Sequence, residues 1–261
     1  MSRFAKWARA LRDKSARHGF ACDCCGVEIF DYPKHRVCKS CDESLAKNTA
    51  RTCFICGRKT YSDGACLDCK SFVPCFDKGC SPFIYDGEVA SLINRLKNGG
   101  LRLVHFFAER LVDAFLESAQ GGRYALNENT DLIIVPVPLT KERRKERGYN
   151  QAEELAFVAQ GLFNKCGIRA RVAENLLIKT RETPSQKDLG VSKRQENAKG
   201  AYRVKERKAC RESVILLIDD IMTTGATGNE CARVLKNAGA KWVYFATCAS
   251  LAEQKHQTAT V

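Results

Sequence analysis

The segment 214–228, VILLIDDIMTTGATG, constrains the fold more than any other part of the chain. Its first five residues are apolar and predict a buried strand over 214–218, and the turn rich in Thr and Gly behind it predicts a loop that opens into a helix. Asp219 and Asp220 follow the strand directly, at the position where open α/β sheets bind ligands. We therefore expect an α/β fold, a parallel sheet with flanking helices, with a binding site at the end of this strand.

The turn behind the two carboxylates is suited to phosphate. It combines hydroxyls, consecutive backbone N–H groups and a helix N-terminus, which together hold a phosphate dianion. Its residues are Thr223, Thr224, Gly225, Ala226 and Thr227. Asp219 and Asp220 can accept hydrogen bonds from the vicinal hydroxyls of a ribose. The segment thus predicts a site for a phosphoribosyl compound, above all 5-phosphoribosyl 1-pyrophosphate (PRPP); the plain alternative is an acidic strand end before a Thr-capped helix.

The chain around this segment alternates helices and strands, which predicts a domain over residues 76–250 with a mostly parallel sheet. Helices are expected at 87–98, 101–118, 149–165 and 227–237, and further strands at 132–137, 171–178 and 242–248. A basic amphipathic pattern predicts a helix over residues 1–20. Residues 251–261 form a polar tail.

Cysteine pairs dominate residues 21–72, where four C-x-x-C motifs occur. Four thiolates suit tetrahedral zinc, and a segment so poor in apolar runs needs metal to fold. We expect a double zinc-ribbon-like module with sequentially paired structural sites, while interleaved pairing, a single site, disulfides and iron–sulfur ligation stay open. The predicted ligands are Cys22, Cys25, Cys38, Cys41, Cys53, Cys56, Cys66 and Cys69.

The net charge of +13 favours polyanions, phosphates or acidic membrane surfaces as partners. Residues 1–20 lack the apolar run of a secretory signal, and the longest apolar stretches are strand-sized. We therefore expect a cytoplasmic protein without a transmembrane segment. In a reducing compartment, clustered cysteines hold metal more often than they form disulfides.

The chain resembles the ComF/GntX family of bacterial competence-associated proteins from Cys22 to about Ser250. The likeness is carried by the cysteine pairs, Leu96-Lys97 with Gly99, VPVPL at 135–139, RGYNQ at 147–151, DDIMTTGAT, and Thr183, Ser185, Gln186, Leu189, Arg194, Asn197 and Gly200. DDIMTTGAT also looks like the PRPP signature of type I phosphoribosyltransferases. The resemblance implies a cysteine zinc module ahead of such a domain, and a role in DNA uptake during natural transformation. Cys24 and Tyr202 depart from the family pattern, neither of them at the phosphate site.

Further basic residues are candidates for the same site. A basic loop at 140–147 follows a neighbouring strand, where a pyrophosphate group needs cations, and Arg147 is its strongest candidate, with Lys97 as a second. The polar stretch 179–211 predicts either a single-strand DNA groove or, as in the type I family, a mobile cover over the ligand. The cover would bring Gln186 and Arg194 to the site.

Two functions fit these features. In one, the domain binds PRPP or a related ligand while the protein handles single-stranded DNA, with a partner in the uptake machinery such as a helicase. In the other, it is a phosphoribosyltransferase in which Mg²⁺ clamps the pyrophosphate leaving group and an unidentified base or amine attacks the ribose. Asp219 and Asp220 are the catalytic candidates in this second case.

Overall fold

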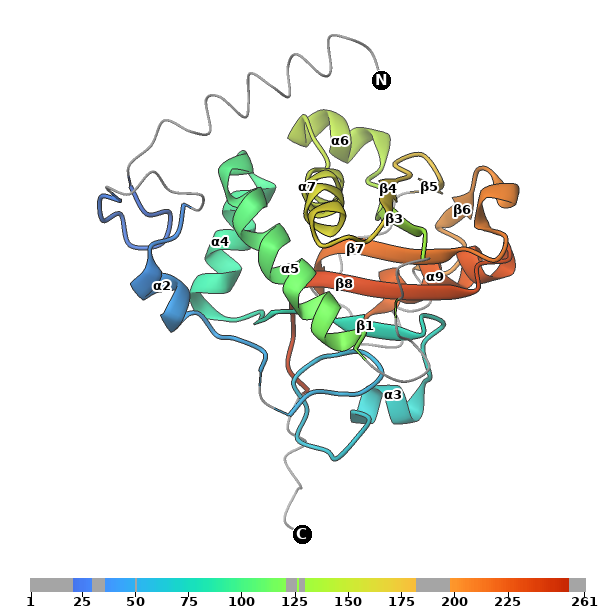
Figure 1. Ribbon diagram of the computed structural model, residues 1–261, viewed down its shortest axis with the longest axis horizontal. Coiled ribbons are helices and arrows are strands. Elements are labelled where there is room, and N and C mark those ends of the chain that lie inside the picture. The colour runs from blue at the N-terminus through green and yellow to red at the C-terminus, as the bar shows by residue number, and fades with distance from the viewer. Residues whose placement is uncertain are drawn as a thin grey trace.

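A parallel six-stranded sheet forms the centre of the molecule (Figure 1). The computed structural model describes residues 21–29, 36–49, 51–120, 126, 130–181 and 198–253. The sheet has the order β1–β8–β7–β3–β4, with β2 also paired to β8. Its strands are β1 Lys78–Cys80, β2 Phe83–Ile84, β3 Leu132–Pro136, β4 Ala170–Val172, β7 Val214–Met222 and β8 Trp242–Ser250. Every pairing within it is parallel, which confirms the predicted fold class.

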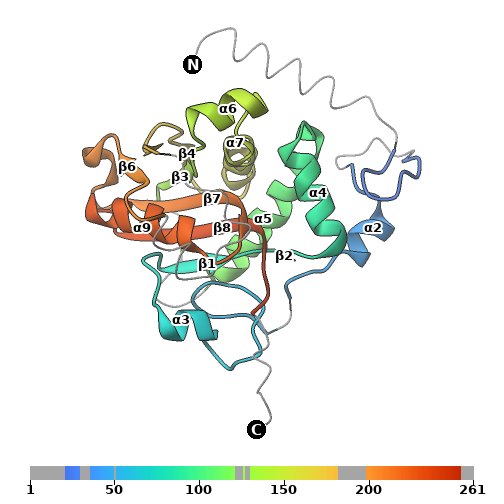
Figure 2. The same cartoon turned by 180° about the vertical axis from the view of Figure 1, so that it is seen from behind.

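The chain leaves the middle of the sheet in opposite directions. From β3 it runs through α6 (Lys141–Arg147) and α7 (Gln151–Lys165) to β4, and from β7 it runs through α9 (Ala226–Asn237) to β8. Right-handed crossovers in opposite directions place their helices on opposite faces. Accordingly, α7 lies in front of the sheet in Figure 1, and α9 lies in front of it in Figure 2, the view from the opposite side. The reversal between β3 and β7 is the switch point at which such sheets bind ligands.

Each face of the sheet carries its own core. On one face α4 (Gly87–Lys97), α5 (Val104–Ser118) and α7 pack around aromatic side chains, with Phe115 and Phe163 edge to face at 5.5 Å between ring centroids. On the other face α9 packs against the sheet. The strand β7 contributes side chains to both cores, since Leu216 belongs to the first core and Leu217 to the second. A strand buried on both faces is typical of a parallel sheet.

Two strands form a separate antiparallel pair, β5 (Leu177–Lys179) with β6 (Tyr202–Val204). The pair is anchored on α9, where Glu230 Oε1 accepts a hydrogen bond from the Gly200 amide at 2.7 Å. A single strand over 171–178 was the wrong prediction, because a turn at Glu174 divides the segment into β4, in the main sheet, and β5, outside it.

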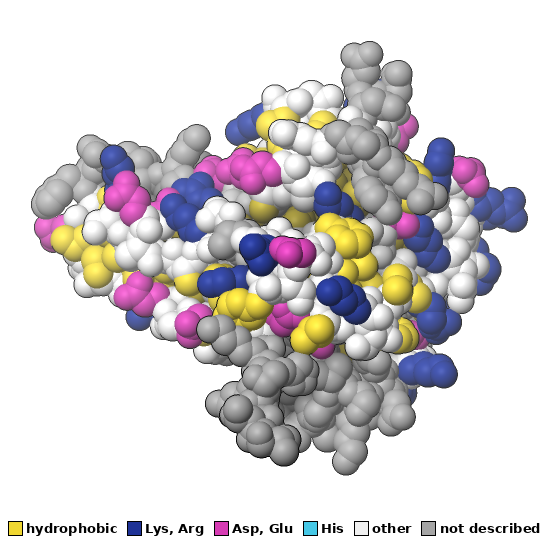
Figure 3. All heavy atoms as spheres, turned by 90° about the horizontal axis from the view of Figure 1, so that it is seen from below, with side chains coloured by type: hydrophobic (Ala, Val, Ile, Leu, Met, Phe, Trp, Pro, Cys, Tyr) yellow, Lys and Arg dark blue, Asp and Glu magenta, His cyan; other side chains and the backbone are white. Residues whose placement is uncertain are grey.

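The cysteine-rich segment is divided between the two faces. Its first part, with α2 (Lys39–Ser44), joins the α4–α5 core, and its second part, with α3 (Leu67–Ser71), joins the α9 core. In Figure 1 the first part lies at the upper left and the second at the bottom. Seen from below (Figure 3), hydrophobic side chains lie among basic ones. The exposed large hydrophobic side chains of the two parts are Val27, Phe54, Tyr61, Leu67, Phe72 and Val73.

The remaining element predictions agree with the structure to within two residues, except at the basic segment 140–147 and at the end of the strand predicted over 214–218. Helix α4 ends one residue before the predicted end, and α9 begins one residue before the predicted start. Residues 101–103 form a 3₁₀ turn (Leu101–Leu103) before α5. Residues 140–147 were predicted as a loop and form α6, because Thr140 caps its start and Gly148 ends it. The predicted N-terminal helix 1–20 and most of the tail 251–261 lie outside the described residues.

Among the helices that the structure describes, none has the length and apolar content needed to cross a bilayer.

Candidate functional site

The strand β7 continues past the end of its neighbour β3. The last pair between them joins Pro136 to Ile218, whereas β7 runs on along β8 as far as Met222. The prediction that the strand ends at 218 was therefore wrong, since pairing with β8 extends it and Asp219 and Asp220 lie inside it. Successive side chains of a strand point to opposite faces, so the two carboxylates diverge into different surroundings.

Asp220 is held by two side chains of the α4–α7 face. Nε2 of Gln151 donates to its Oδ2 at 2.6 Å, and Nζ of Lys97 lies 3.3 Å from the same oxygen. Nη1 of Arg147 in turn donates to Oε1 of Gln151 at 3.1 Å. With only 6% of its surface exposed, Asp220 needs such a charged partner and such hydrogen bonds. The predicted cations Arg147 and Lys97 thus meet the predicted carboxylate in one network.

The RGYNQ motif explains how this network is built. Gly148 ends α6 at φ 75°, a left-handed conformation that favours glycine. The buried Tyr149 hydroxyl donates to the Leu96 carbonyl and accepts from the Gly99 amide at 2.7 Å. These bonds fix the end of α4 that carries Lys97. The buried tyrosine is therefore a packing and positioning residue.

The next residue in the motif starts α7. The Asn150 side chain accepts a hydrogen bond from the Ala152 amide at 3.1 Å, as a helix cap does, and donates to the Val137 carbonyl at 3.1 Å. The cap therefore joins α7 to the chain just beyond β3. It places Gln151, the first helical residue, where its side chain reaches β7.

Asp219 lies on the α9 side of β7. Its charge adds to the burial that raises the pKa of Cys231, a residue of α9. Burial, together with the charge of Asp220, raises the pKa of Asp219 itself to about 7, against the opposing effect of Lys97 and Lys179. A carboxyl group with a pKa near neutrality can exchange a proton at physiological pH.

Residues 223–227, here called the phosphate turn, join β7 to α9. Gly225 has φ 78° and caps α9, and its carbonyl accepts from the Asn229 amide at 2.8 Å. An added Cβ there would meet nothing closer than Met222 Sδ at 3.8 Å, so the backbone conformation rather than lack of space requires glycine. Ala226 is buried, and the other four residues of the turn are partly exposed. Solvent therefore reaches the turn, as a phosphate site requires.

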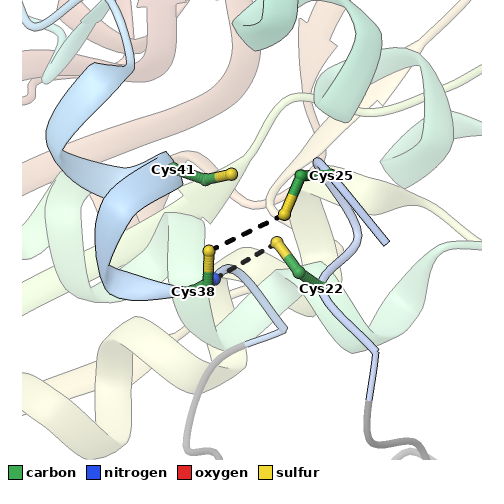
Figure 4. A group of neighbouring side chains, drawn as sticks. All are labelled: Cys22, Cys25, Cys38 and Cys41. Carbon is green, nitrogen blue, oxygen red and sulfur yellow. Dashed lines mark hydrogen bonds between the residues drawn. The ribbon is translucent and has the colours of Figure 1, made fainter. Parts of the chain in front are cut away.

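The first cysteine cluster consists of Cys22, Cys25, Cys38 and Cys41, whose sulfur atoms all lie within 4.8 Å of one another. Figure 4 shows the four sulfurs turned toward one centre. Sγ of Cys25 and Cys38 are 3.9 Å apart, and the Cys38 amide donates to Cys22 Sγ at 3.3 Å. Thiolates about 2.3 Å from a tetrahedral zinc lie roughly 3.8 Å from one another, so the set fits zinc.

The second cysteine cluster consists of Cys53, Cys56, Cys66 and Cys69, also within 4.8 Å and all buried. Sγ of Cys56 and Cys66 are 3.7 Å apart, and the Cys66 amide donates to Cys53 Sγ at 3.3 Å. All eight cysteines are free thiols. The sequential grouping agrees with the predicted pairing and rules out the interleaved one. Four thiolates leave no open coordination position, so each cluster suits a structural ion.

Charged side chains attach each cluster to the α/β domain. In the first, Asp23 lies beside Cys22 and its Oδ1 lies 2.6 Å from Nη2 of Arg102, just before α5. In the second, Arg58 contacts both Asp68 and the Thr223 carbonyl of the phosphate turn. Burial lowers the pKa of Arg58, but the negative charges of Cys56 and Asp68 outweigh that effect, so the pKa is raised. The segment that carries the second cluster thus contacts the predicted phosphate site through Arg58.

Several of these residues were not predicted from the sequence. Gln151 and Tyr149 stand inside the motif RGYNQ, but nothing local indicates that they reach β7 and α4. Arg58 follows the C-x-x-C-G motif of Cys53 and contacts a residue 165 positions away. Gln186 and Arg194, the predicted cover residues, lie outside the described residues.

Comparison with protein-family models gives no match. Three curated relatives match 79% of the chain each. Competence protein ComFC of Bacillus subtilis is 27% identical and covered to 80%, and competence protein F of Haemophilus influenzae is 28% identical and covered to 86%. The DNA utilization protein YhgH of Escherichia coli O6:H1 is 31% identical and covered to 87%.

Two solved structures resemble about half of the chain. The allosteric regulatory enzyme of purine biosynthesis matches with a TM-score of 0.31 and 15% identity over 54% of this chain. Glutamine PRPP amidotransferase from B. subtilis, complexed with ADP and GMP, matches with 0.30 and 16% over 53%. The matches span 25% and 24% of those two chains. At such TM-scores neither match carries a conclusion about this chain.

Proposed function

The chain belongs to the ComF family, and from this premise we propose that it binds PRPP together with Mg²⁺ at the switch point between β3 and β7 and acts in DNA uptake. The observation that carries the proposal is the arrangement around β7. Two carboxylates lie beyond the end of β3, and the solvent-accessible phosphate turn follows them at the start of α9. A sugar phosphate needs hydroxyl acceptors and an anion site at this spacing.

Each group of the site has a place in the proposal. The 5′-phosphate would sit on the amides and hydroxyls of the phosphate turn. The ribose would lie along the edge of β7 that β3 leaves unpaired, with its vicinal hydroxyls donating to Asp219 and Asp220. Arg147 and Lys97 supply positive charge on the α4–α7 face for the pyrophosphate group.

Mg²⁺, when bound with PRPP, neutralises the pyrophosphate oxygens and screens them from the carboxylates. Without the ligand Lys97 neutralises Asp220. We expect Lys97 to change partners when the pyrophosphate arrives, because the ligand brings more negative charge than the single carboxylate that Lys97 contacts.

Calorimetric titration with PRPP and Mg²⁺ tests the ligand. Asp220→Asn keeps the shape of the side chain and the acceptor for Gln151 but removes the charge, so we expect binding to be lost. Asp131→Asn is the matched control. Asp131 is an exposed carboxylate just before β3, so it lies at the amino-terminal end of the strand, away from the proposed site. If wild type and Asp220→Asn bind equally, or neither binds, the ligand assignment is wrong.

The DNA part of the proposal rests on the relatives and on charge. The relatives are named for competence and DNA utilization, and this chain carries a net charge of +13. Lys and Arg contacts to phosphates release counterions, so binding to single-stranded DNA should weaken steeply with salt. Retention of a single-stranded oligonucleotide should therefore fall as salt is raised. Absence of retention at low salt would contradict the DNA role and leave the PRPP site untouched.

The second candidate function is catalysis of phosphoribosyl transfer. It is favoured by Asp219, whose pKa of about 7 suits a group that takes a proton from an attacking nitrogen. Incubation with PRPP, Mg²⁺ and a panel of bases and amines should then release pyrophosphate, and release should stop in Asp219→Asn. If PRPP binds without turnover for any acceptor, the binding function stands alone.

A further inference from the structure

One side chain joins the second cysteine cluster to the phosphate turn. Arg58 is 5% exposed and lies between them. Its Nη1 is 2.6 Å from Oδ2 of Asp68, and its Nη2 donates to the Thr223 carbonyl at 3.0 Å. A guanidinium presents several donors in a rigid planar fork, so the positions of these two acceptors are tied to each other.

The third nitrogen of Arg58 takes part in neither contact. Nε is buried and has no hydrogen-bond partner among the described atoms, and Cys56, a member of the second cluster two residues earlier in the chain, acts on the charge of the guanidinium. Four thiolates around a zinc dication leave a net charge of −2, and N–H donors around such sites orient and stabilise the sulfur ligands. A metal-loaded cluster would therefore place further negative charge beside the guanidinium, in addition to that of Asp68.

The body of the cluster is firmly attached to the α/β domain. The carboxylate of Glu253, beyond β8, accepts from the Leu67 amide at 2.6 Å and from the Tyr61 amide at 2.8 Å. At Gly57 an added Cβ would lie 2.4 Å from the Gly79 carbonyl oxygen, so the two backbones are in close contact. The cluster thus has a fixed base on the sheet from which Arg58 reaches the turn.

The phosphate turn has little packing on the same side. A cavity of about 390 Å³ lies between the cluster and the turn, with Cys69, Phe72, Thr224 and Gly225 in its lining. Arg58 also lines this cavity and is a polar link across it. The conformation of a loop beside a cavity depends more on each such hydrogen bond than does that of a loop packed in the core, because fewer contacts hold it.

We propose that Arg58 is a positioning residue that couples metal occupancy of the second cysteine cluster to the affinity of the phosphate turn for its ligand. The inference rests on the proposed function, since it takes the turn as the phosphate site. Coupling between two sites is reciprocal in binding free energy. Zinc in the cluster tightens ligand binding at the turn, and ligand at the turn tightens zinc by the same factor.

The test uses the full-length zinc-loaded protein and Arg58→Gln. Arg51→Gln is the matched control, because Arg51 is in the same module but exposed and paired to Asp63 away from the turn. With zinc content unchanged, we expect Arg58→Gln to weaken binding of Mg²⁺–PRPP about tenfold, in the usual range of such couplings. Arg51→Gln should bind as wild type. Equal affinity of all three zinc-loaded proteins would overturn the proposal.

A second readout follows from reciprocity. Equilibrium competition with a chelator should show that PRPP tightens one of the two zinc sites about tenfold in wild type and Arg51→Gln, and not in Arg58→Gln. If PRPP leaves zinc affinity unchanged in wild type, the coupling does not exist.

Amide hydrogen exchange at residues 223–227 separates failure of this inference from failure of the proposed function, because it needs no ligand. In the zinc-loaded proteins exchange there should be faster in Arg58→Gln than in wild type. If wild type does not bind PRPP, the proposed function fails, and exchange alone decides the coupling.

Should Arg58→Gln lose zinc, Arg58→Lys replaces it, because lysine keeps the charge beside the thiolates but cannot span Asp68 and Thr223. Wild-type exchange in zinc-loaded Arg58→Lys would overturn the inference.

Discussion

Asp219 and Asp220 are neighbours in sequence, yet the fold gives them different chemistry. Asp220 points to the α4–α7 face, where Lys97 and Gln151 hold it. Asp219 points to the α9 face, where burial and the charge of Asp220 raise its pKa to about 7. A carboxyl group with a raised pKa beside one that is held by a cation suits a site that divides proton transfer and binding between them.

Replacing Asp219 by Asn should stabilise the ligand-free protein at alkaline pH. The pKa of Asp219 is raised on folding from 3.8 to about 7, so the folded state binds its proton more tightly than the unfolded state does. Wild type therefore loses stability as pH rises from 4 through 7, whereas the variant has no such loss. Thermal unfolding at pH 5 and pH 8 should show a larger gain for Asp219→Asn at pH 8. An equal gain at both values would contradict the raised pKa.

Replacing Gln151 by Glu should destabilise the protein in a pH-dependent way. A second carboxylate would stand where Nε2 now donates to Asp220 Oδ2 at 2.6 Å, so two like charges would meet in a buried site. Protonation of either group restores a hydrogen bond, so stability should recover at pH 5. Gln160→Glu is the control on the same helix, because Gln160 bonds a backbone carbonyl instead. A pH-independent loss would show that the contact with Asp220 is not what matters.

At the scale of elements, the start of α9 packs in close contact with the sheet. Gly228 lies in its first turn, and an added Cβ would be 2.4 Å from Cε1 of the buried Phe245 on β8. This close approach sets the position of the helix start and hence of the phosphate turn. Glycine is the residue that permits it.

Two glycine-to-alanine changes should therefore have opposite effects. Gly228→Ala forces a shift of α9 or Phe245 and should cost roughly 1–3 kcal/mol, as overpacking of a core does. Gly161→Ala on α7 meets nothing within 4 Å and should instead stabilise by about 0.5–1 kcal/mol through helix propensity. Chemical denaturation of both variants measures the difference. A neutral Gly228→Ala would contradict the close packing of α9.

The elements that sequence predicts best are those whose pattern is local. The apolar run of β7 and the caps of α9 stand out, and both elements were predicted. The α6 helix was missed because KERRKER has no apolar periodicity, although Thr140 and Gly148 bracket it. The true end of β7 was missed because it depends on pairing with β8, which no local signal reveals.

At the scale of the molecule, the two cysteine clusters brace opposite faces of one sheet. Sequence grouped the eight cysteines correctly, since the C-x-x-C spacing is local. It could not place the clusters against different cores, because contacts such as that of Arg58 with Thr223 join residues 165 positions apart. Each cluster supplies buried residues to the core on its own side.

Metal removal should consequently loosen both faces. We expect elemental analysis to find two zinc ions per chain, one for each cluster, and one in either Cys25→Ser or Cys56→Ser. Chelation should lower the unfolding temperature, because the ligands are part of the cores. Finding iron, or no metal in protein purified without chelators, would contradict the zinc assignment.

The most direct test of the whole account is a structure of the protein in complex with PRPP and Mg²⁺. We expect the 5′-phosphate on the amides of residues 223–227, the ribose hydroxyls on Asp219 and Asp220, and the pyrophosphate near Arg147 and Lys97. A ligand seated at the other end of the strands, or a phosphate turn that makes no contact with it, would contradict this assignment.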